Sequence, residues 1–179
     1  MIEMGDLAGN PTIPLAARQL VDQQRLGFVA TICKDGSPNL SPKGTVSVWD
    51  NDHLVFADLD SPGTVANLER DARVEVNVVD PVLRKGWRFK GRAEVLRGGP
   101  RFEQGLRFFE RAKLRDAPKR IRSLVLVRVE KATPLISPAY STGRSEAEIR
   151  TEFWSRYKRL YEPGPQTGTN TVPPQEGTR

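Results

Sequence analysis

The stretch LSPKGTVSVWDNDHLVFADLDSPGTVANLERD, residues 40–71, contains the local signals that decide the fold. Residues 40–49 alternate polar and apolar side chains, which is the pattern of a half-exposed strand. An Asp-Asn-Asp turn follows and predicts a hairpin with a return strand over residues 53–57. The Ser-Pro pair that opens residues 61–71 is typical of an N-cap followed by proline in the first turn, so we expect a helix there.

The start of this helix and one side of the first strand form a candidate anion site. The first amides of a helix have no acceptor within the helix, and that end carries partial positive charge, so it suits a phosphate. Lys43, on the same alternating face as Ser41 and Thr45, would add a charge-assisted contact to the anion. An ordinary capped surface helix beside a hairpin is the competing interpretation, and these residues alone leave both open.

The remaining chain continues this mixture of strands and helices. We expect helices over residues 15–24, 100–114 and 146–161, and strands over residues 28–34, 72–80, 86–97 and 121–135. Together with the two strands of the opening stretch, this gives six strands with short connections. Such a pattern predicts a small closed or split antiparallel barrel.

Composition indicates one ordinary domain. The chain has 179 residues with 37% apolar content, enough to bury a core. We expect a flexible N-terminus over residues 1–12, a single domain over residues 13–161, and a disordered C-terminal tail over the Pro-, Gly- and Thr-rich residues 162–179. No apolar run is long enough to cross a membrane and no signal-peptide pattern opens the chain, so we expect a cytoplasmic protein without a membrane partner.

The net charge of +6 is unevenly distributed. Residues 84–128 hold 15 basic and 4 acidic side chains, whereas the rest of the chain holds 13 basic and 18 acidic ones. A basic region of this kind suits a nucleic acid or a small anionic ligand, and its plainest interpretation is a solvated surface. Since no nucleic-acid motif accompanies it, we expect no nucleic-acid partner.

The sequence contains no constellation of side chains for hydrolysis and no cluster of metal ligands. His53 is the single histidine and Cys33 the single cysteine. Without a base, a nucleophile or a ligand set, chemistry would have to be carried by a cofactor.

Five short segments lie in order between residues 26 and 135, and they are Ala30-Thr31, Asp35-Gly36-Ser37-Pro38, Ser41-Pro42-Lys43-Gly44, Ser61 through Leu68, and Arg88-Phe89-Lys90-Gly91. Their order and spacing together resemble the pyridoxamine 5'-phosphate oxidase-like family of FMN-binding split barrels. The resemblance implies a mainly β (α+β) fold, a six-stranded antiparallel split β-barrel with flanking helices. It also implies a homodimer with cofactor sites at the interface.

The resemblance further implies an FMN site and an oxidoreductase acting on an unknown small molecule. The flavin ring would lie over the strand that carries Ser41, Pro42, Lys43, Gly44 and Thr45. The phosphate would lie near Lys43, Ser61, Gly63 and Thr64, with Arg88 or Lys90 reaching it from an adjacent strand or from the partner subunit. The ribityl hydroxyls would reach Asn67.

One position departs from the family pattern. Many members carry a lysine or arginine two residues after the serine that opens the helix, and here that residue is Gly63. A contact between phosphate and a charged side chain contributes roughly 1.5–3 kcal/mol, so we expect FMN to bind one to two orders of magnitude more weakly. The arginine and histidine pattern that binds pyridoxamine phosphate in true oxidases is missing, so we do not expect vitamin B6 oxidation.

Three alternatives to an FMN oxidoreductase stay open at this point. The first is a deazaflavin-dependent reductase on the same fold, whose acidic coenzyme tail would suit the basic residues 84–128. The second is a non-catalytic flavin carrier or sensor. The third is a basic nucleic-acid-binding protein, which a steep salt dependence of DNA binding would reveal.

Overall fold

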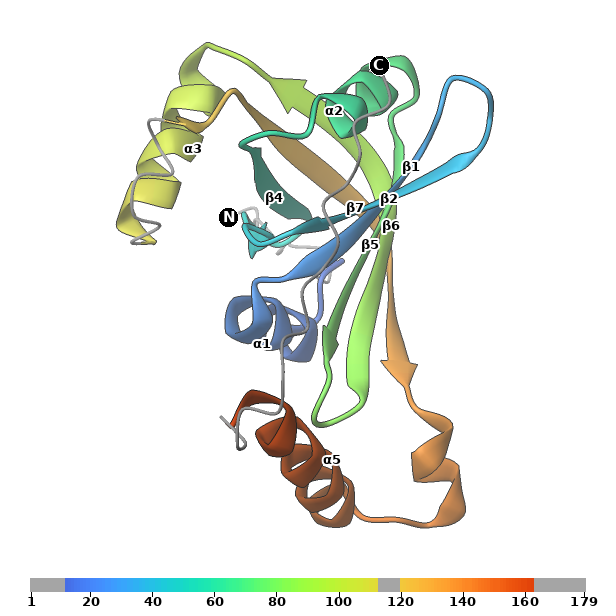
Figure 1. The fold of residues 1–179 in the computed structure, drawn as a ribbon. Coiled ribbons are helices and arrows are strands. Elements are labelled where there is room, and N and C mark those ends of the chain that lie inside the picture. Colours follow the sequence, from blue (N-terminus) through green and yellow to red (C-terminus); the bar gives the residue numbers. More distant parts are fainter. Residues whose placement is uncertain (1–11, 113–119, 163–179) are drawn as a thin grey trace, which may run out of the picture.

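The computed structural model describes residues 12–112 and 120–162 (Figure 1). The flexible N-terminus and the disordered tail that we expect lie almost entirely outside these residues. In the described part, seven strands form one antiparallel sheet in the spatial order β2-β1-β5-β6-β7-β4-β3. The strands are β1 (Gly27–Ile32), β2 (Pro38–Lys43), β3 (Ser47–Val48), β4 (His53–Asp58), β5 (Arg73–Asp80), β6 (Lys85–Leu96) and β7 (Ser123–Ile136).

The predicted strand over residues 40–49 is divided into two, which corrects the expected strand count from six to seven. Its first half, β2, pairs with β1, and its second half, β3, pairs with β4. The alternation of side chains continues through both halves, so the pattern alone does not reveal the division. The exposed Gly44 follows Lys43 at the point where the chain leaves β1.

This division explains how the sheet curls. β2 and β3 lie at opposite ends of the strand order, yet only residues 44–46 connect them. Four consecutive Cα–Cα steps span at most about 14 Å, so the two edges of the sheet must approach each other. The sheet therefore wraps into the predicted split barrel (Figure 1).

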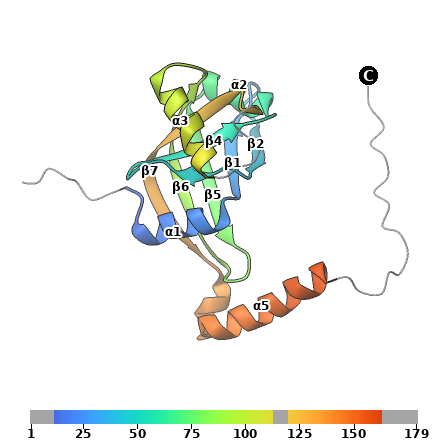
Figure 2. The same cartoon turned by 90° about the vertical axis from the view of Figure 1, so that its left-hand side faces the viewer.

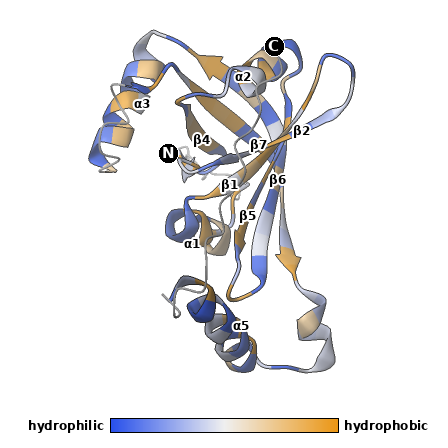
Figure 3. Ribbon diagram, in the orientation of Figure 1, coloured by the Kyte–Doolittle hydropathy of each residue, from blue (hydrophilic) through white to orange (hydrophobic). Residues whose placement is uncertain are grey.

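The core fills the inside of this curled sheet, and helices close its two ends. The valines of the inner face and Phe89 are completely buried, which assigns Phe89 to the core rather than to a ligand site. Helix α1 (Leu15–Gln24) contributes Ala17 and Val21 to this core, and helix α2 (Pro62–Arg70) contributes Leu68. Figure 3 shows most of the hydrophobic colour in the central strands.

A second apolar layer lies on the outside of β4 and β7. Helix α3 (Pro100–Arg111) covers this layer, and Phe109 is completely buried against Val55, Leu124 and their neighbours, as its helical spacing predicts. Gly105 lets the helix approach closely, because a Cβ there would lie 2.1 Å from Leu124 Cδ1. α3 thus stands on one wall of the barrel (Figure 2).

Gly91 marks a close contact in the middle of β6. The register between β6 and β7 shifts between Lys90 and Gly91, which is the signature of a β-bulge. A Cβ on Gly91 would lie 2.0 Å from the carbonyl oxygen of Arg128. β6 and β7 therefore approach each other closely at this glycine, as a glycine in mid-strand often allows.

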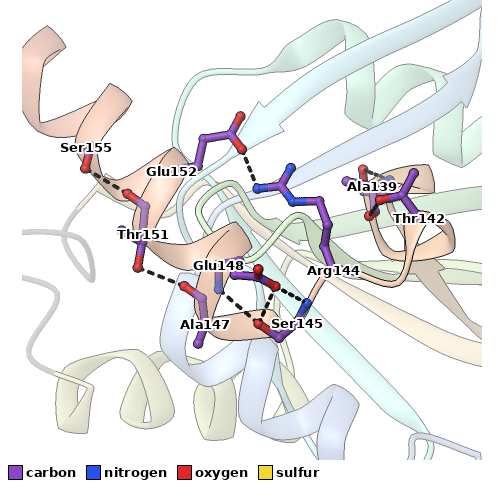
Figure 4. A network of polar contacts seen from close by, with 10 residues as sticks. Ala139, Thr142, Arg144, Ser145, Ala147, Glu148, Thr151, Glu152 and Ser155 are labelled. Carbon is purple, nitrogen blue, oxygen red and sulfur yellow. Dashed lines mark hydrogen bonds and ion pairs between the residues drawn. The ribbon is translucent and has the colours of Figure 1, made fainter.

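A short 3-10 turn (Pro138–Thr142) leads from β7 to helix α5 (Glu146–Tyr161), which projects from the barrel (Figure 2). A capping box opens this helix, with the Glu148 amide 3.3 Å from Ser145 Oγ and the Ser145 amide 2.7 Å from Glu148 Oε2 (Figure 4). Within this helix only Ile149 is buried, and Trp154, Leu160 and Tyr161 are largely exposed. Among the described helices, none is both long enough and apolar enough to cross a membrane.

Candidate functional site

Lys43 is a buried lysine at the end of β2. Its side chain lies on the inner side of the sheet. Its cross-strand partner Gly27 is buried there, and so is Val29, which pairs with Ser41 on the same face. The side chain is only 6% exposed, and its ammonium donates a 2.6 Å hydrogen bond to Ser41 Oγ. No carboxylate of residues 12–112 or 120–162 lies within ion-pair distance of it. A lysine ammonium has three donors, so this one has capacity for a further acceptor.

The electrostatic environment of Lys43 is set by burial and by one carboxylate. Burial lowers the pKa of Lys43, and the nearby charge of Asp58 partly opposes this effect. Asp58 is itself buried at the end of β4, where its Oδ1 accepts 2.8 Å hydrogen bonds from the amide and the hydroxyl of Ser61. Its Oδ2 accepts a 3.3 Å hydrogen bond from Ser123 Oγ. The carboxylate therefore serves the loop before α2, and the charge of Lys43 has no contact partner of opposite sign.

The start of α2 offers free amide groups. Ser61 occupies the predicted N-cap position before Pro62, but its hydroxyl donates to Asp58 instead of accepting from the helix, so the expected side-chain cap is wrong. The reason is that a charged acceptor three residues earlier competes for that hydroxyl. The amides of Gly63 and Thr64 consequently have no acceptor within the described residues. An anion at this helix end would satisfy them.

Two other predicted site residues have structural hydrogen bonds. Thr45 is buried and its hydroxyl accepts a 2.9 Å bond from the Ala57 amide, which fastens the turn after β2 to β4. Asn67 is also buried, and its Nδ2 donates to Thr31 Oγ1 at 3.1 Å. Asn67 therefore holds α2 against β1, and its proposed contact with ribityl hydroxyls stays a prediction.

Arg88 and Lys90 lie on the opposite face of the sheet from Lys43. Cross-strand partners lie on the same face of a sheet, and pairing joins Arg88 to Asn77, Asn77 to Phe28 and Phe28 to Pro42. Pro42 precedes Lys43 on β2, so it faces the other way. Both cations contact Glu75, with N···O distances of 2.9 Å for Arg88 Nε and 3.6 Å for Lys90 Nζ. The structure thus links Ser41 and Lys43 to Ser61, and so to Gly63 and Thr64 at the start of α2, through the charge of Asp58, while Thr45 is joined to β4 and Asn67 to β1. It separates Pro42, Arg88 and Lys90 from them within one chain.

Two residues of this region were not predicted. Asp58 orders the loop before α2. The sequence could have indicated this role, because an Asp three residues before a Ser often accepts a hydrogen bond from the backbone amide of that Ser. Ser123 comes from β7 and meets Asp58 only through the pairing of β4 with β7. Both residues line a small cleft of about 210 Å³ beside Pro62 and Val65 of α2.

The described residues contain no group of three His, Cys, Asp or Glu side chains that could hold a metal ion. His53 pairs with Asp50 at 2.8 Å on the hairpin between β3 and β4. The polar groups near Lys43 are therefore suited to binding an anion rather than a cation.

Comparison with known proteins identifies the family of this chain. The family model described as "Pyridoxamine 5'-phosphate oxidase" matches residues 13–134, well over half of the chain. The chain belongs to the pyridoxamine 5'-phosphate oxidase family. The matched region contains the barrel up to the last two residues of β7 and ends before α5.

Solved structures of this fold come from several proteins. The HupZ protein of Group A Streptococcus is 26% identical, with a TM-score of 0.62 over 70% of this chain and 95% of that chain. An FMN-binding protein from Syntrophomonas wolfei subsp. wolfei is 16% identical, with a TM-score of 0.56 over 66% and 82% of the two chains. An F420 reductase is 21% identical, with a TM-score of 0.54 over 68% and 98%. The last two show the fold alone, and a search of curated protein sequences finds no match.

Proposed function

We propose that this member of the pyridoxamine 5'-phosphate oxidase family is an oxidoreductase that binds FMN and acts on a small molecule. The single observation that carries the proposal is Lys43, a buried cation without an ion-pair partner among the described residues. An uncompensated buried charge is unfavourable, so such a site favours a ligand that brings the opposite charge. A phosphate ester is such a ligand.

The residues present fit the phosphate of a flavin. Lys43 would supply the charge, and the amides of Gly63 and Thr64 would supply hydrogen bonds at the positive end of α2. Ser41 would orient the ammonium through the hydrogen bond that already joins the two side chains. When bound, the flavin would supply hydride acceptance and donation, and the protein's part is to bind and orient it.

The outer face of the sheet supports the homodimer that the resemblance implies. Phe28, Leu40 and Val79 are 41%, 64% and 39% exposed there, a cluster of apolar side chains on neighbouring strands. On the same face, Asn77 Oδ1 is buried and accepts no hydrogen bond from a described residue. A second copy of the chain on this face would cover the apolar side chains and would carry Arg88 and Lys90 to the interface.

A deazaflavin is the second candidate cofactor. Gly63 withholds the side-chain charge that would strengthen the contact with the FMN phosphate, and residues 84–128 are strongly basic. The similar fold of the F420 reductase supports this candidate at the level of the scaffold. A larger acidic coenzyme would draw on the basic region as well as on Lys43.

Loading the protein with each cofactor separates these functions. We expect FMN to be retained through gel filtration and its visible absorption to bleach when NADH or NADPH is added without oxygen. Retained FMN that no nicotinamide donor bleaches would favour a carrier or sensor. Retention of the deazaflavin but not of FMN would favour the second candidate, and retention of neither would contradict the proposal.

A further inference from the structure

A second candidate ligand site lies between α1 and α3, beside Trp49, which directly follows β3. It is a cleft of about 690 Å³, within the usual size range of ligand pockets. Its lining includes Trp49, Phe108, Arg25, Arg107 and Arg111. We call it the arginine cleft, and it shares no residue with the region around Lys43.

The wall of the arginine cleft is aromatic. Trp49 and Phe108 are both half-buried, and their ring centroids are 5.7 Å apart at an interplanar angle of 47°. Gly105 lets α3 lie close to the sheet beside this wall, because a Cβ on it would lie 2.1 Å from Leu124 Cδ1, whereas the Trp49 ring would be at the ordinary contact distance of 3.7 Å. Two partly accessible aromatic faces of this kind suit a planar ring, which gains from offset or tilted stacking.

The charge around this wall is positive. Arg107 and Arg111 are one turn apart on α3 and both are exposed, so they repel each other on the same helix. Neither they nor Arg25 forms an ion pair within the part of the chain that the structure describes. Among the described residues that line the cleft, Asp22 is the one carboxylate, and it opposes three guanidinium groups.

Arg25 is held at the cleft in an unfavourable backbone conformation. It is the residue after α1 and has a φ of 53°, in the left-handed region that glycine adopts more easily. Its Nη1 donates a 3.3 Å hydrogen bond to the carbonyl of Ala112, which fixes the guanidinium beside the end of α3. The chain thus places a charged side chain at a helix end where glycine would be less strained.

We infer that the arginine cleft binds a planar aromatic compound that carries a phosphate group. The ring would stack on Trp49 and Phe108, and the guanidinium groups would bind the phosphate in the fork geometry that suits its oxygens. The residues that line the arginine cleft are all different from those around Lys43, so the two sites are expected to act independently. The inference does not depend on the proposed flavin function.

Fluorescence of Trp49 provides the test. In the full chain with Trp87→Phe and Trp154→Phe, Trp49 is the remaining tryptophan. We expect phenyl phosphate to quench its emission in a saturable way, at about a tenfold lower concentration than either inorganic phosphate or phenol needs. If phenyl phosphate produces no saturable quenching, or binds no better than inorganic phosphate, the inference is wrong.

Substitutions locate the site. Arg107→Ala and Arg111→Ala should each weaken phenyl phosphate binding about tenfold, whereas Arg156→Ala, which removes the same charge from an exposed position on α5, should leave it unchanged. Thermal unfolding of each variant checks that it is folded. Lys43→Ala should leave the quenching of Trp49 by phenyl phosphate unchanged, because this fluorescence reports on the arginine cleft and not on the flavin site. If Arg156→Ala weakens binding equally, the effect comes from the net charge of the protein and not from the arginine cleft. If Lys43→Ala loses binding, the ligand lies at the flavin site. Either result overturns the inference.

Discussion

The ammonium of Lys43 lies 2.6 Å from the hydroxyl oxygen of Ser41, two residues earlier on the same strand. This contact fixes the direction of a charged group that is almost completely buried and has no carboxylate within ion-pair distance among the described residues. Its charge is nearest to Asp58, whose oxygens are occupied by Ser61 and Ser123. Lys43 is therefore oriented before any ligand arrives, and several consequences can be measured.

Affinity for FMN should fall as pH rises, and the fall should begin at a lower pH than it would if Lys43 had an ordinary lysine pKa. Burial lowers the pKa of Lys43 below its usual 10.5, so the free protein loses this charge as pH rises through the lowered value. The phosphate stays doubly charged above neutral pH, so it keeps its charge while Lys43 loses its own. Titrations between neutral pH and pH 10.5 should show a rising dissociation constant.

The same titration in Lys43→Arg should stay flat, because a guanidinium keeps its charge over this range. Relative to Lys43→Arg, the free wild-type protein should also gain stability as pH rises toward 10.5, since the unfolded chain then holds the Lys43 proton more tightly than the folded chain. An FMN affinity that is constant up to pH 10.5 in the wild type would argue against Lys43 as the phosphate ligand.

Gly63→Lys should strengthen FMN binding. Gly63 is exposed, its φ is not in the left-handed region, and a Cβ would meet no atom within 4 Å, so a lysine fits there. The added charge at the start of α2 should improve the affinity about tenfold. Gly98→Lys adds the same charge at another open position and should leave the affinity unchanged. Equal FMN affinities for the two variants would contradict the proposed position of the phosphate at the start of α2.

Phe28→Glu should weaken the homodimer. Phe28 is 41% exposed in the apolar cluster on the outer face of β1, and a carboxylate there would be buried without a partner. Light scattering should give twice the chain mass of 20.0 kDa for the wild type and the single mass for the variant at the same concentration. Leu15→Glu, at the more exposed Leu15 of α1, should remain dimeric. A monomeric wild type would refute the dimer.

Gly91→Ala should destabilise the barrel. The new methyl group would lie 2.0 Å from the backbone oxygen of Arg128, so β6 and β7 would have to separate at the bulge. We expect the free energy of unfolding to fall by about 1–3 kcal/mol, which denaturant titration can measure. Gly98→Ala, where the methyl group meets no atom within 4 Å, serves as the control. A loss no larger than the control's would mean that the bulge tolerates a side chain.

The fold was largely predictable because its signals are local. Alternating side chains, turn residues and helix caps place β4, α2 and α5 within a residue or two of their true ends. The division of residues 40–49 into β2 and β3 was not predictable in this way, since it depends on which distant strand each half meets.

The candidate site was predictable in part. Lys43 and the start of α2 follow from local pattern, but the link through Asp58 to Ser123 requires two strands that are 65 residues apart in sequence. The position of Arg88 and Lys90 on the other face depends on the register of four strands, which no local pattern fixes. Their role, like the cytoplasmic location, stays a prediction.

The most direct test of the central claim compares FMN with riboflavin, which has the same ring system and lacks the phosphate. Dissociation constants for both should be measured with the wild type, Lys43→Ala and the control Lys158→Ala, whose lysine forms an exposed ion pair on α5. If Lys43 binds the phosphate, the wild type and the control should prefer FMN by at least about tenfold, and Lys43→Ala should lose most of that preference. An equal preference in all three proteins, or no flavin binding to any of them, would contradict the account.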